Sequence, residues 1–267
     1  MAYEFFTEHP VFTTEEFKGF RATLGTPGPR AAESLLGYYQ KKGRIVRAKR
    51  GLYVVFPPGN RADSFVPDPF LLASRMSHDA VLVHHTALEF HGRAHSVFER
   101  FTYQTGTSPR PLSFRNWKFQ PVSVPGALQK QGREDFGVIT VERNGMDVRV
   151  ASLERTLVDV LSRSVYSGSW EEIWRSLESV EFFDLEQVVE YVLLLANASA
   201  TAKVGFFLEQ HRERLFVEEQ HLEPLRKMRP GRPLYLNRGK RKNSRLVKAW
   251  NLMVPDEILN RSWAEIL

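Results

Sequence analysis

The sequence predicts an α+β protein with three successive parts: a small N-terminal module of helices and a hairpin, a mixed α+β region, and a mainly helical C-terminal part. Residues 13–55 carry two helical patterns followed by a strand-turn-strand pattern. Residues 95–150 are rich in β-branched and aromatic residues, whereas residues 151–230 repeat apolar residues at spacings of three and four. The length of 267 residues allows one large domain or two to three small ones.

The first module opens with a helix whose two ends are both marked. In TTEEFKGFRATLG, Thr13 is followed three residues later by Glu16, the pattern of a capping box, and Gly25 ends the segment. TPGP then predicts a tight turn, and RAAESLLGYYQKKG predicts a second helix closed by Gly43. The next stretch, KKGRIVRAKRGLYVV, places two short apolar runs around a turn. Helix, turn, helix and hairpin follow the order of a winged helix-turn-helix, which we assign to residues 1–57.

The second helix is predicted to have a packing face and a polar face. At 100° per residue, the packing face gathers six residues: Ala31, Ala32, Leu35, Leu36, Tyr38 and Tyr39. The opposite face holds Arg30, Ser34, Gly37 and Lys41. Arginine can bind guanine in a bidentate way, serine can contact a base edge or a phosphate, and glycine lets the helix backbone approach a groove. We therefore expect this helix to read DNA sequence.

The hairpin is strongly basic. Six of its fifteen residues are Lys or Arg and none is acidic, so the charges repel one another unless a polyanion neutralises them. Lys49 and Arg50 are expected to contact phosphates or the minor groove from the tip, while Leu52 and Val54 pack inward. The flank is predicted to hold Lys41, Lys42, Arg44 and Arg47. The whole chain has 37 basic and 31 acidic residues, a net charge of +6, which is compatible with a nucleic-acid partner.

The rest of the chain is predicted to form a C-terminal domain, residues 70–267, after a proline-rich linker at residues 58–69. Asn144-Gly145 indicates a hairpin within the β-rich part, residues 95–150. Asp184 and Gln187 predict a capping box. Four helical segments are expected in residues 151–230: SLERTLVDVLSR, SWEEIWRSLESV, DLEQVVEYVLLLA and ATAKVGFFLEQHRERL.

Residues 226–248 form a basic segment with ten Lys or Arg and no acidic residue. One interpretation is a second nucleic-acid or partner surface, in which Tyr235 could stack on a base. The cations assigned to that surface are Arg238, Lys240, Arg241, Lys242 and Arg245. The other interpretation is a solvated, mobile hairpin around residues 234–236. The sequence leaves both open.

Several classes of site are absent from the sequence. Without cysteine there is no disulfide and no thiolate chemistry, which fits the cytoplasm, the expected location. We expect no signal peptide and no membrane span, because no suitable apolar run is present. Five histidines fall between residues 78 and 95, and His84 and His91 would share a helix face. Gly92 is expected to end that helix, however, with His85 or Thr86 at its start and His91 in a structural role, so no metal site is predicted.

Two catalytic alternatives have sequence support but lack essential parts. Gly168-Ser169 followed by Asp184 and Glu186 resembles the metal-binding pattern of nucleotidyltransferases, yet Asp184 falls where a helix cap is expected. Asp135, Glu142 and Arg143 resemble a nuclease site without its lysine. We therefore expect no enzyme activity, no catalytic residues and no cofactor, with a metal-dependent nucleotidyltransferase or nuclease left as an alternative.

KKGRIVRAKRGLYVV resembles the wing of the AbiEi-type antitoxins and related predicted transcriptional regulators. Three further blocks resemble the same family in the same order: AVLVHHTALEFHG (80–92), VRVASLERTLVDVLSR (148–163) and NASATAKVGFFLEQ (197–210). The resemblance implies DNA-contact roles for Arg30, Ser34, Lys41, Lys49 and Arg50, whereas it transfers no residue for toxin neutralisation. The basic segment is heavier than the family leads us to expect.

The resemblance implies a function in a type IV toxin–antitoxin system. The N-terminal winged helix would bind the promoter of its own operon, with inverted repeats as the expected operator, and repress it. The C-terminal part would counteract a nucleotidyltransferase toxin, with which it need not form a stable complex. A DNA-binding regulator that has no toxin partner stays open as the alternative.

Overall fold

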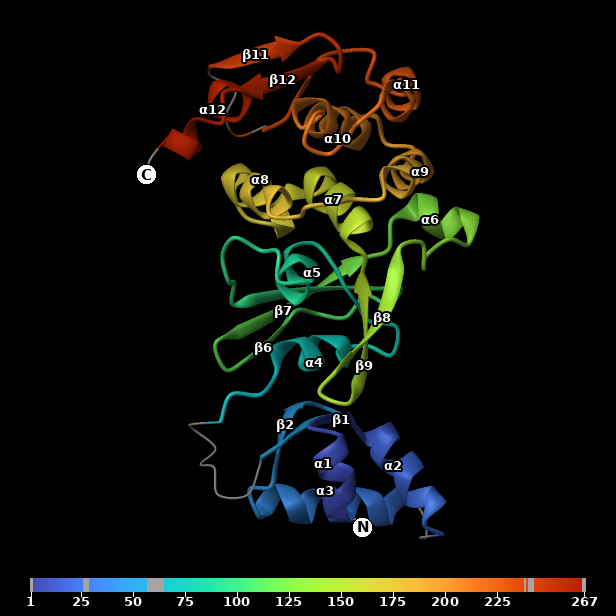
Figure 1. Cartoon of the computed structure of the whole chain (residues 1–267). Helices are drawn as coiled ribbons and strands as arrows, with labels where there is room; N and C mark the ends of the chain where they lie inside the picture. The colour runs from blue at the N-terminus through green and yellow to red at the C-terminus, as the bar shows by residue number, and fades with distance from the viewer. Residues whose placement is uncertain (1, 26–28, 57–64, 238, 240–242, 266–267) are drawn as a thin grey trace. The chain divides into compact units, whose positions relative to one another are not determined.

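The computed structural model describes residues 2–25, 29–56, 65–237, 239 and 243–265 (Figure 1). Its helices and sheets confirm the α+β class. The chain divides into two compact units, the first made of residues 1–82, 99–122 and 140–149 and the second of residues 83–98, 123–139 and 150–267. Residues 58–64 of the predicted linker at 58–69 lie outside the described residues, and the first unit combines the N-terminal module with most of the following β-region.

Residues 2–25 and 29–56 of the N-terminal module form three helices and three strands. The capping box predicted at Thr13 is confirmed: the Glu16 amide donates to Thr13 Oγ1 (3.1 Å), and the Thr13 amide donates to Glu16 Oε2 (2.6 Å). Gly25 and Gly43 have φ of +65° and +67°, which suits the stops predicted there. The elements are α1 (Ala2–Glu8), β1 (Val11–Thr13), α2 (Thr14–Thr23), α3 (Pro29–Lys41), β2 (Ile45–Lys49) and β3 (Leu52–Val55).

The first helix and first strand complete this module. β1 pairs antiparallel with β3, which also pairs with β2, so a third strand extends the predicted hairpin into a sheet of order β1-β3-β2. An aromatic cluster joins α1, β1 and α2, with the Phe5 ring centroid 5.1 Å from that of Phe12 and 5.3 Å from that of Phe17. These buried rings give a module of this size a core of its own.

The remainder of the first unit contains α4 (Pro69–Ser74), capped by Asp68, and most of a six-stranded sheet. The order of the sheet is β6-β7-β5-β4-β9-β8. Asn144 and Gly145 have φ of +52° and +76° between its last two strands, which confirms the predicted hairpin. The strands are β4 (Val81–Leu82), β5 (Arg100–Thr105), β6 (Leu112–Phe114), β7 (Trp117–Ser123), β8 (Val138–Arg143) and β9 (Met146–Ala151).

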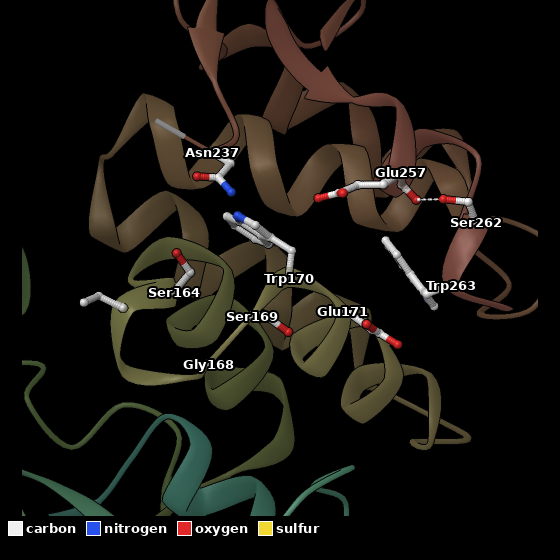
Figure 2. A pocket seen from close by; sticks show the side chains of 10 residues that line it. Ser164, Gly168, Ser169, Trp170, Glu171, Asn237, Glu257, Ser262 and Trp263 are labelled. Atoms are coloured by element: carbon white, nitrogen blue, oxygen red, sulfur yellow. Dashed lines mark hydrogen bonds between the residues drawn. The ribbon is translucent and has the colours of Figure 1, made fainter. Parts of the chain in front are cut away.

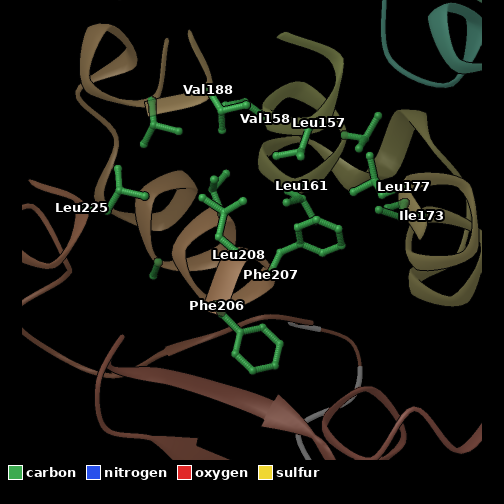
Figure 3. Close-up of a cluster of buried hydrophobic side chains, with 14 of the residues drawn as sticks. Leu157, Val158, Leu161, Ile173, Leu177, Val188, Phe206, Phe207, Leu208 and Leu225 are labelled. Carbon is green, nitrogen blue, oxygen red and sulfur yellow. The ribbon is translucent and has the colours of Figure 1, made fainter. Parts of the chain in front are cut away.

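The second unit is mainly helical, as predicted for residues 151–230. Its core is a cluster of buried aliphatic and aromatic side chains contributed by α7 to α11 (Figure 3). The Asp184 side chain accepts a hydrogen bond from the Gln187 amide (3.0 Å) and caps α9, but the predicted capping box is incomplete, because the Asp184 amide donates to Glu154 Oε1 (3.3 Å) and not to Gln187. The helices are α5 (His85–Phe90), α6 (Gly126–Gln131), α7 (Leu153–Ser162), α8 (Trp170–Glu178), α9 (Leu185–Leu195), α10 (Ala198–Gln210) and α11 (Glu219–Lys227).

A second small sheet, which the sequence did not predict, lies near the C-terminus of the chain (Figure 1). β10 (Leu234–Tyr235) pairs parallel with β12 (Leu252–Pro255), which pairs antiparallel with β11 (Ser244–Val247). The predicted mobile hairpin around residues 234–236 is wrong, because these residues form an ordered strand and its end. Leu236 is 3% exposed and packs in the core, so apolar burial fixes the segment. α12 (Asp256–Leu259) and a short 3₁₀ helix, Ser262–Glu265, follow.

Candidate nucleic-acid interface

The β2–β3 hairpin has one buried and one exposed side, as predicted. Leu52 and Val54 are fully buried, whereas Arg47 and Arg50 are exposed. Gly51, with φ of +81°, occupies the left-handed position of the turn. Arg47 on β2 and Arg50 in the turn thus face solvent, while the inward-facing apolar residues of β3 hold the hairpin to the module.

Lys49 occupies a different position from the one expected at a free tip. Its side chain is half-buried, and its Nζ donates a hydrogen bond to the carbonyl of Met76. Burial lowers the pKa of Lys49. This lysine therefore ties the hairpin to the segment after α4, and Arg50 is the more accessible of the two tip cations.

Helix α3 presents part of its predicted polar face to solvent. Ser34 and Lys41 are exposed, and a Cβ added at Gly37 would meet no atom within 4 Å. Arg30 is the second residue of this helix, and its side chain lies outside the described part of the structure. The packing face is narrower than predicted, because Ala31 and Tyr38 are exposed.

Two further predicted cations rest on tyrosine rings. Lys42 is exposed, with its Nζ 5.8 Å from the ring centroid of Tyr38. The Arg44 guanidinium lies 5.0 Å from the ring centroid of Tyr3, a residue of α1. Such cation–π contacts hold long side chains in place at the end of α3. The supporting role of Tyr3 was missed because α1 was not predicted; the apolar pair Phe5-Phe6 just after it was the available signal.

An acidic residue also lies on the outer side of α3. Glu33 is exposed, and its Oε1 is 2.9 Å from Lys18 Nζ on α2. The helical-wheel prediction left this residue out. Glu33 would repel a phosphate, so the electropositive part of α3 is its C-terminal end, which leads into the hairpin.

The C-terminal basic segment contributes one of its predicted cations to the described structure. Arg245 lies on β11 with its Nε 2.7 Å from Asp256 Oδ1. Arg238, Lys240, Arg241 and Lys242 lie outside the described residues. Tyr235 is half-buried on β10. The second nucleic-acid or partner surface thus stays a prediction.

The histidines have structural surroundings. His91 Nε2 lies 2.8 Å from the carbonyl of Ala151, in keeping with its predicted structural role. His85 is fully buried, with Nδ1 2.8 Å from Glu89 and Nε2 3.0 Å from Glu172. The helix predicted to be capped by His85 or Thr86 begins one residue earlier, with His84 at the cap position. Within residues 2–265, where described, no three His, Asp or Glu side chains are grouped as a metal site requires.

Three residues named in the two catalytic alternatives cap helices or form an ion pair. Ser169 caps α8 by accepting a hydrogen bond from the Glu172 amide (3.1 Å), and Asp184 caps α9. Arg143 Nε lies 2.5 Å from Asp68 Oδ2, the residue that caps α4. Each of these contacts stabilises the fold locally. Among the helices that the structure describes, none has the length and apolarity needed to cross a bilayer.

His84 makes the stability of the second unit dependent on pH. Burial lowers the pKa of His84 to about 4, with Asp159, Arg155 and Arg163 as the charged groups around it. Since unfolded histidine has a pKa of about 6.5, the unfolded chain binds an extra proton as the pH falls from 7 towards 4, and that proton uptake favours unfolding. The contribution of His84 is therefore present above about pH 6.5 and is lost below it.

The titration of His84 should lower the free energy of unfolding by about 2 kcal/mol between pH 7 and pH 5, because pH 5 lies about 1.5 units below the unfolded pKa and each unit is worth about 1.36 kcal/mol. We expect His84→Asn to abolish this loss. Asparagine tolerates the φ of +56° found at this position. Urea unfolding at the two pH values measures the effect. His78→Asn is the control, because the His78 side chain is 85% exposed and should leave the pH dependence unchanged.

Comparisons with known proteins show the fold. The sequence matches no known family model and no curated protein. The chain is structurally similar to the RV2827C protein from Mycobacterium tuberculosis, with a TM-score of 0.64 over 99% of this chain and 94% of that chain. The two sequences are 17% identical, so the similarity establishes a common fold and carries no function across.

Proposed function

We propose that this chain is a double-stranded DNA-binding autorepressor whose N-terminal module is a winged helix-turn-helix. In this proposal α2 and α3 form the helix-turn-helix, α3 enters the major groove, and the β2–β3 hairpin is the wing. The observation that carries the proposal is one run of exposed cations, Lys41, Lys42, Arg47 and Arg50, from the end of α3 to the hairpin tip. The sequence has no acidic residue between Glu33 and Asp63 to offset them.

The geometry of the module supports a division of roles between its cations and the exposed side of α3. Cations at the end of α3 and on the hairpin would contact phosphates, which fixes position and supplies affinity without reading sequence. Ser34 and Gly37 lie on the exposed side of α3, where base edges would be reached, and Arg30 precedes them along the helix. Two copies on an inverted repeat would match the usual symmetry of such operators.

We further propose that the chain acts as an antitoxin against a nucleotidyltransferase toxin. This part rests on the resemblance of the three sequence blocks. Their elements adjoin in the second unit: His91 of the first contacts the Ala151 carbonyl of the second (2.8 Å), and Lys203 of the third lies 3.4 Å from the Ser162 carbonyl. Short apolar blocks that occur in a fixed order are what we expect of segments that pack together in one core.

Gly37→Ala separates DNA binding from folding. An alanine in a helix interior stabilises it by about 0.5–1 kcal/mol relative to glycine, and a Cβ here meets no protein atom within 4 Å. If α3 lies in a groove at Gly37, the added methyl group should nevertheless weaken binding to operator DNA, by roughly tenfold. Thermal unfolding and DNA titration measure the two effects. Unchanged or tighter operator binding in this variant would place the DNA on another face of the module.

The antitoxin role is tested by co-expression. Growth of cells expressing the nucleotidyltransferase toxin that the proposal places beside this gene, alone and with this chain, gives the readout. We expect the chain to restore growth, including when Arg47 and Arg50 are both alanine, because neutralisation is assigned to the second unit. Toxicity that persists in the presence of the chain would leave a DNA-binding regulator without a toxin partner.

A further inference from the structure

Two phenylalanine side chains of the second unit are exposed, although rings of this size are usually buried. Phe182 is 75% exposed in the segment between α8 and α9, and Phe216 is 81% exposed in the segment between α10 and α11. The adjacent residues Phe183, Leu215 and Val217 are buried in the core of the unit. The core therefore accounts for the neighbours of the two rings and leaves the rings themselves unexplained.

Side-chain contacts join the two segments on both sides of the exposed rings. Before the rings, an Arg214 N–H donates a hydrogen bond to the Val180 carbonyl (2.8 Å). After the rings, His221 Nε2 lies 3.3 Å from Glu186 Oε1. The two rings thus belong to one surface strip between segments that are fixed to each other. We call this strip, residues 178–186 and 212–221, the phenylalanine seam.

The seam is separate from the cavity of about 470 Å³ at the start of α8 (Figure 2). Trp170 and Glu171 line that cavity from the first turn of α8, whereas the seam begins at Glu178, where α8 ends. Glu171 Oε1 is 2.9 Å from Arg175 Nε, and the Trp170 ring centroid is 5.4 Å from Lys203 Nζ. These two side chains of the cavity already have partners, so the exposed rings of the seam are the stronger sign of a binding surface.

The backbone at Phe216 disfavours a large side chain. Its φ of +53° is in the left-handed region, which glycine and asparagine adopt with the least strain. The buried residues on either side fix this conformation, but they do not require an aromatic ring between them. A bulky, exposed side chain at a strained position indicates a role for the side chain itself.

The seam is acidic, although the chain as a whole has a net charge of +6. Residues 176–202 contain five acidic residues and no basic residue, and residues 213–223 contain four acidic residues and one basic residue. Glu181, which precedes Phe182, and Glu213 are both exposed. Negative charge around the rings repels nucleic acid and favours a protein partner with a positively charged surface.

We propose, on the basis of the antitoxin function, that the phenylalanine seam is the surface that contacts the toxin. A nucleotidyltransferase binds nucleotides, which are polyanions, and a site for polyanions is electropositive. The carboxylates of the seam complement such a site, and the two rings would fill apolar recesses beside it, as aromatic anchors do in protein interfaces. A seam bound there would exclude the nucleotide, so neutralisation would need no chemical step.

Growth of cells that express the proposed nucleotidyltransferase toxin, together with the chain or its variants, tests the seam. The double variant Phe182→Asn, Phe216→Asn should fold with an unchanged or higher midpoint of thermal unfolding, because both side chains are exposed and asparagine tolerates positive φ. We expect this variant to bind operator DNA normally and to lose the ability to restore growth. The control Val97→Asn replaces an apolar residue of the same unit that is 88% exposed and lies outside the seam, and it should restore growth.

The outcomes separate this surface from the function on which it depends. Growth restored equally by the wild-type chain and the double variant would overturn the seam alone. Failure of the wild-type chain to restore growth would refute the antitoxin function, and the seam with it.

Fluorescence titration of the labelled chain with the purified toxin tests the charge of the seam. Glu181→Gln, Glu213→Gln should weaken binding roughly fivefold, with a flatter dependence on salt. The control Glu8→Gln, Glu142→Gln removes the same charge from exposed positions in the first unit and should leave binding unchanged. Equal weakening by both pairs would show that net charge attracts the toxin, and an equal response to an unlabelled second copy of the chain would show self-association; either result would overturn the proposal.

Discussion

Replacing Gly205 with alanine is expected to lower the free energy of unfolding by about 3 kcal/mol, the upper part of the usual range for overpacked cores. Gly205 lies in α10, where a Cβ would be 2.2 Å from Cζ3 and 2.3 Å from Cη2 of Trp250. The Trp250 ring cannot easily move away. It is fully buried, and its indole N–H donates to Glu209 Oε2 at 2.8 Å.

Urea unfolding of Gly205→Ala measures this effect, and two further variants control it. Gly19→Ala in α2, where a Cβ meets nothing within 4 Å, should instead stabilise the protein by about 0.5–1 kcal/mol. Trp250→Leu should make Gly205→Ala much less costly, because the two residues are in contact and their effects are not additive. A loss below about 0.5 kcal/mol in Gly205→Ala would show that α10 and Trp250 are not packed as described.

The double variant Arg47→Ala, Arg50→Ala is expected to weaken DNA binding roughly 30-fold at 0.15 M salt. Each lost phosphate contact reduces the slope of log K against log salt by about 0.9, so the slope should flatten by about 1.8. Both arginines are exposed on the hairpin, so their removal should cost little stability. Phosphate contacts carry no sequence information, and the loss should be similar on operator and random DNA.

Fluorescence titrations at several salt concentrations check this expectation. The control is Lys118→Ala, Lys130→Ala, which removes the same charge from two exposed positions outside the module. If the control variant flattens the slope by as much, the affinity for DNA depends on the net charge of the protein, and the hairpin does not act as a wing. Lys49→Ala should have a smaller effect than Arg50→Ala, since Lys49 is bonded to the Met76 carbonyl.

Features with a local signature could be read from the sequence. The structure confirms the capping box formed by Thr13 and Glu16 and the helix cap at Asp184. Each depends on a hydrogen bond between one side chain and the backbone amide three residues later. The Asn144-Gly145 hairpin is confirmed for the same reason, since both residues accept positive φ. Helices α7 to α10 are also confirmed, because their apolar spacing reflects one buried face.

Features that depend on distant partners could not be read in this way. β1 is three residues long, and its existence depends on pairing with β3, more than 35 positions later. The partner of Lys49 is a backbone carbonyl 27 residues away. The C-terminal sheet depends on β10 pairing with β12, whose partner residues Leu252 and Met253 lie 18 positions later in the sequence.

Phe216 shows a conflict between local preference and fold. The Val217 amide donates to the Arg212 carbonyl (2.9 Å) and the Phe216 amide to that of Glu213 (3.4 Å), which forms a Schellman motif. Phe216 occupies its left-handed position with φ of +53°, where glycine is usual, and its side chain is 81% exposed. The burial of Leu215 and Val217 on either side outweighs the strain, and no local rule predicts that outcome.

The central claim, that the N-terminal module reads DNA, is tested most directly by titrating the purified protein against its own upstream DNA and a scrambled duplex. The measurement covers several salt concentrations up to about 0.15 M, where non-specific phosphate binding is weak. The proposed autorepressor should prefer its upstream DNA throughout this range, with the preference reduced in Gly37→Ala. Equal and steeply salt-dependent binding to both duplexes would contradict sequence reading by α3 and leave a surface that binds polyanions without selecting among them.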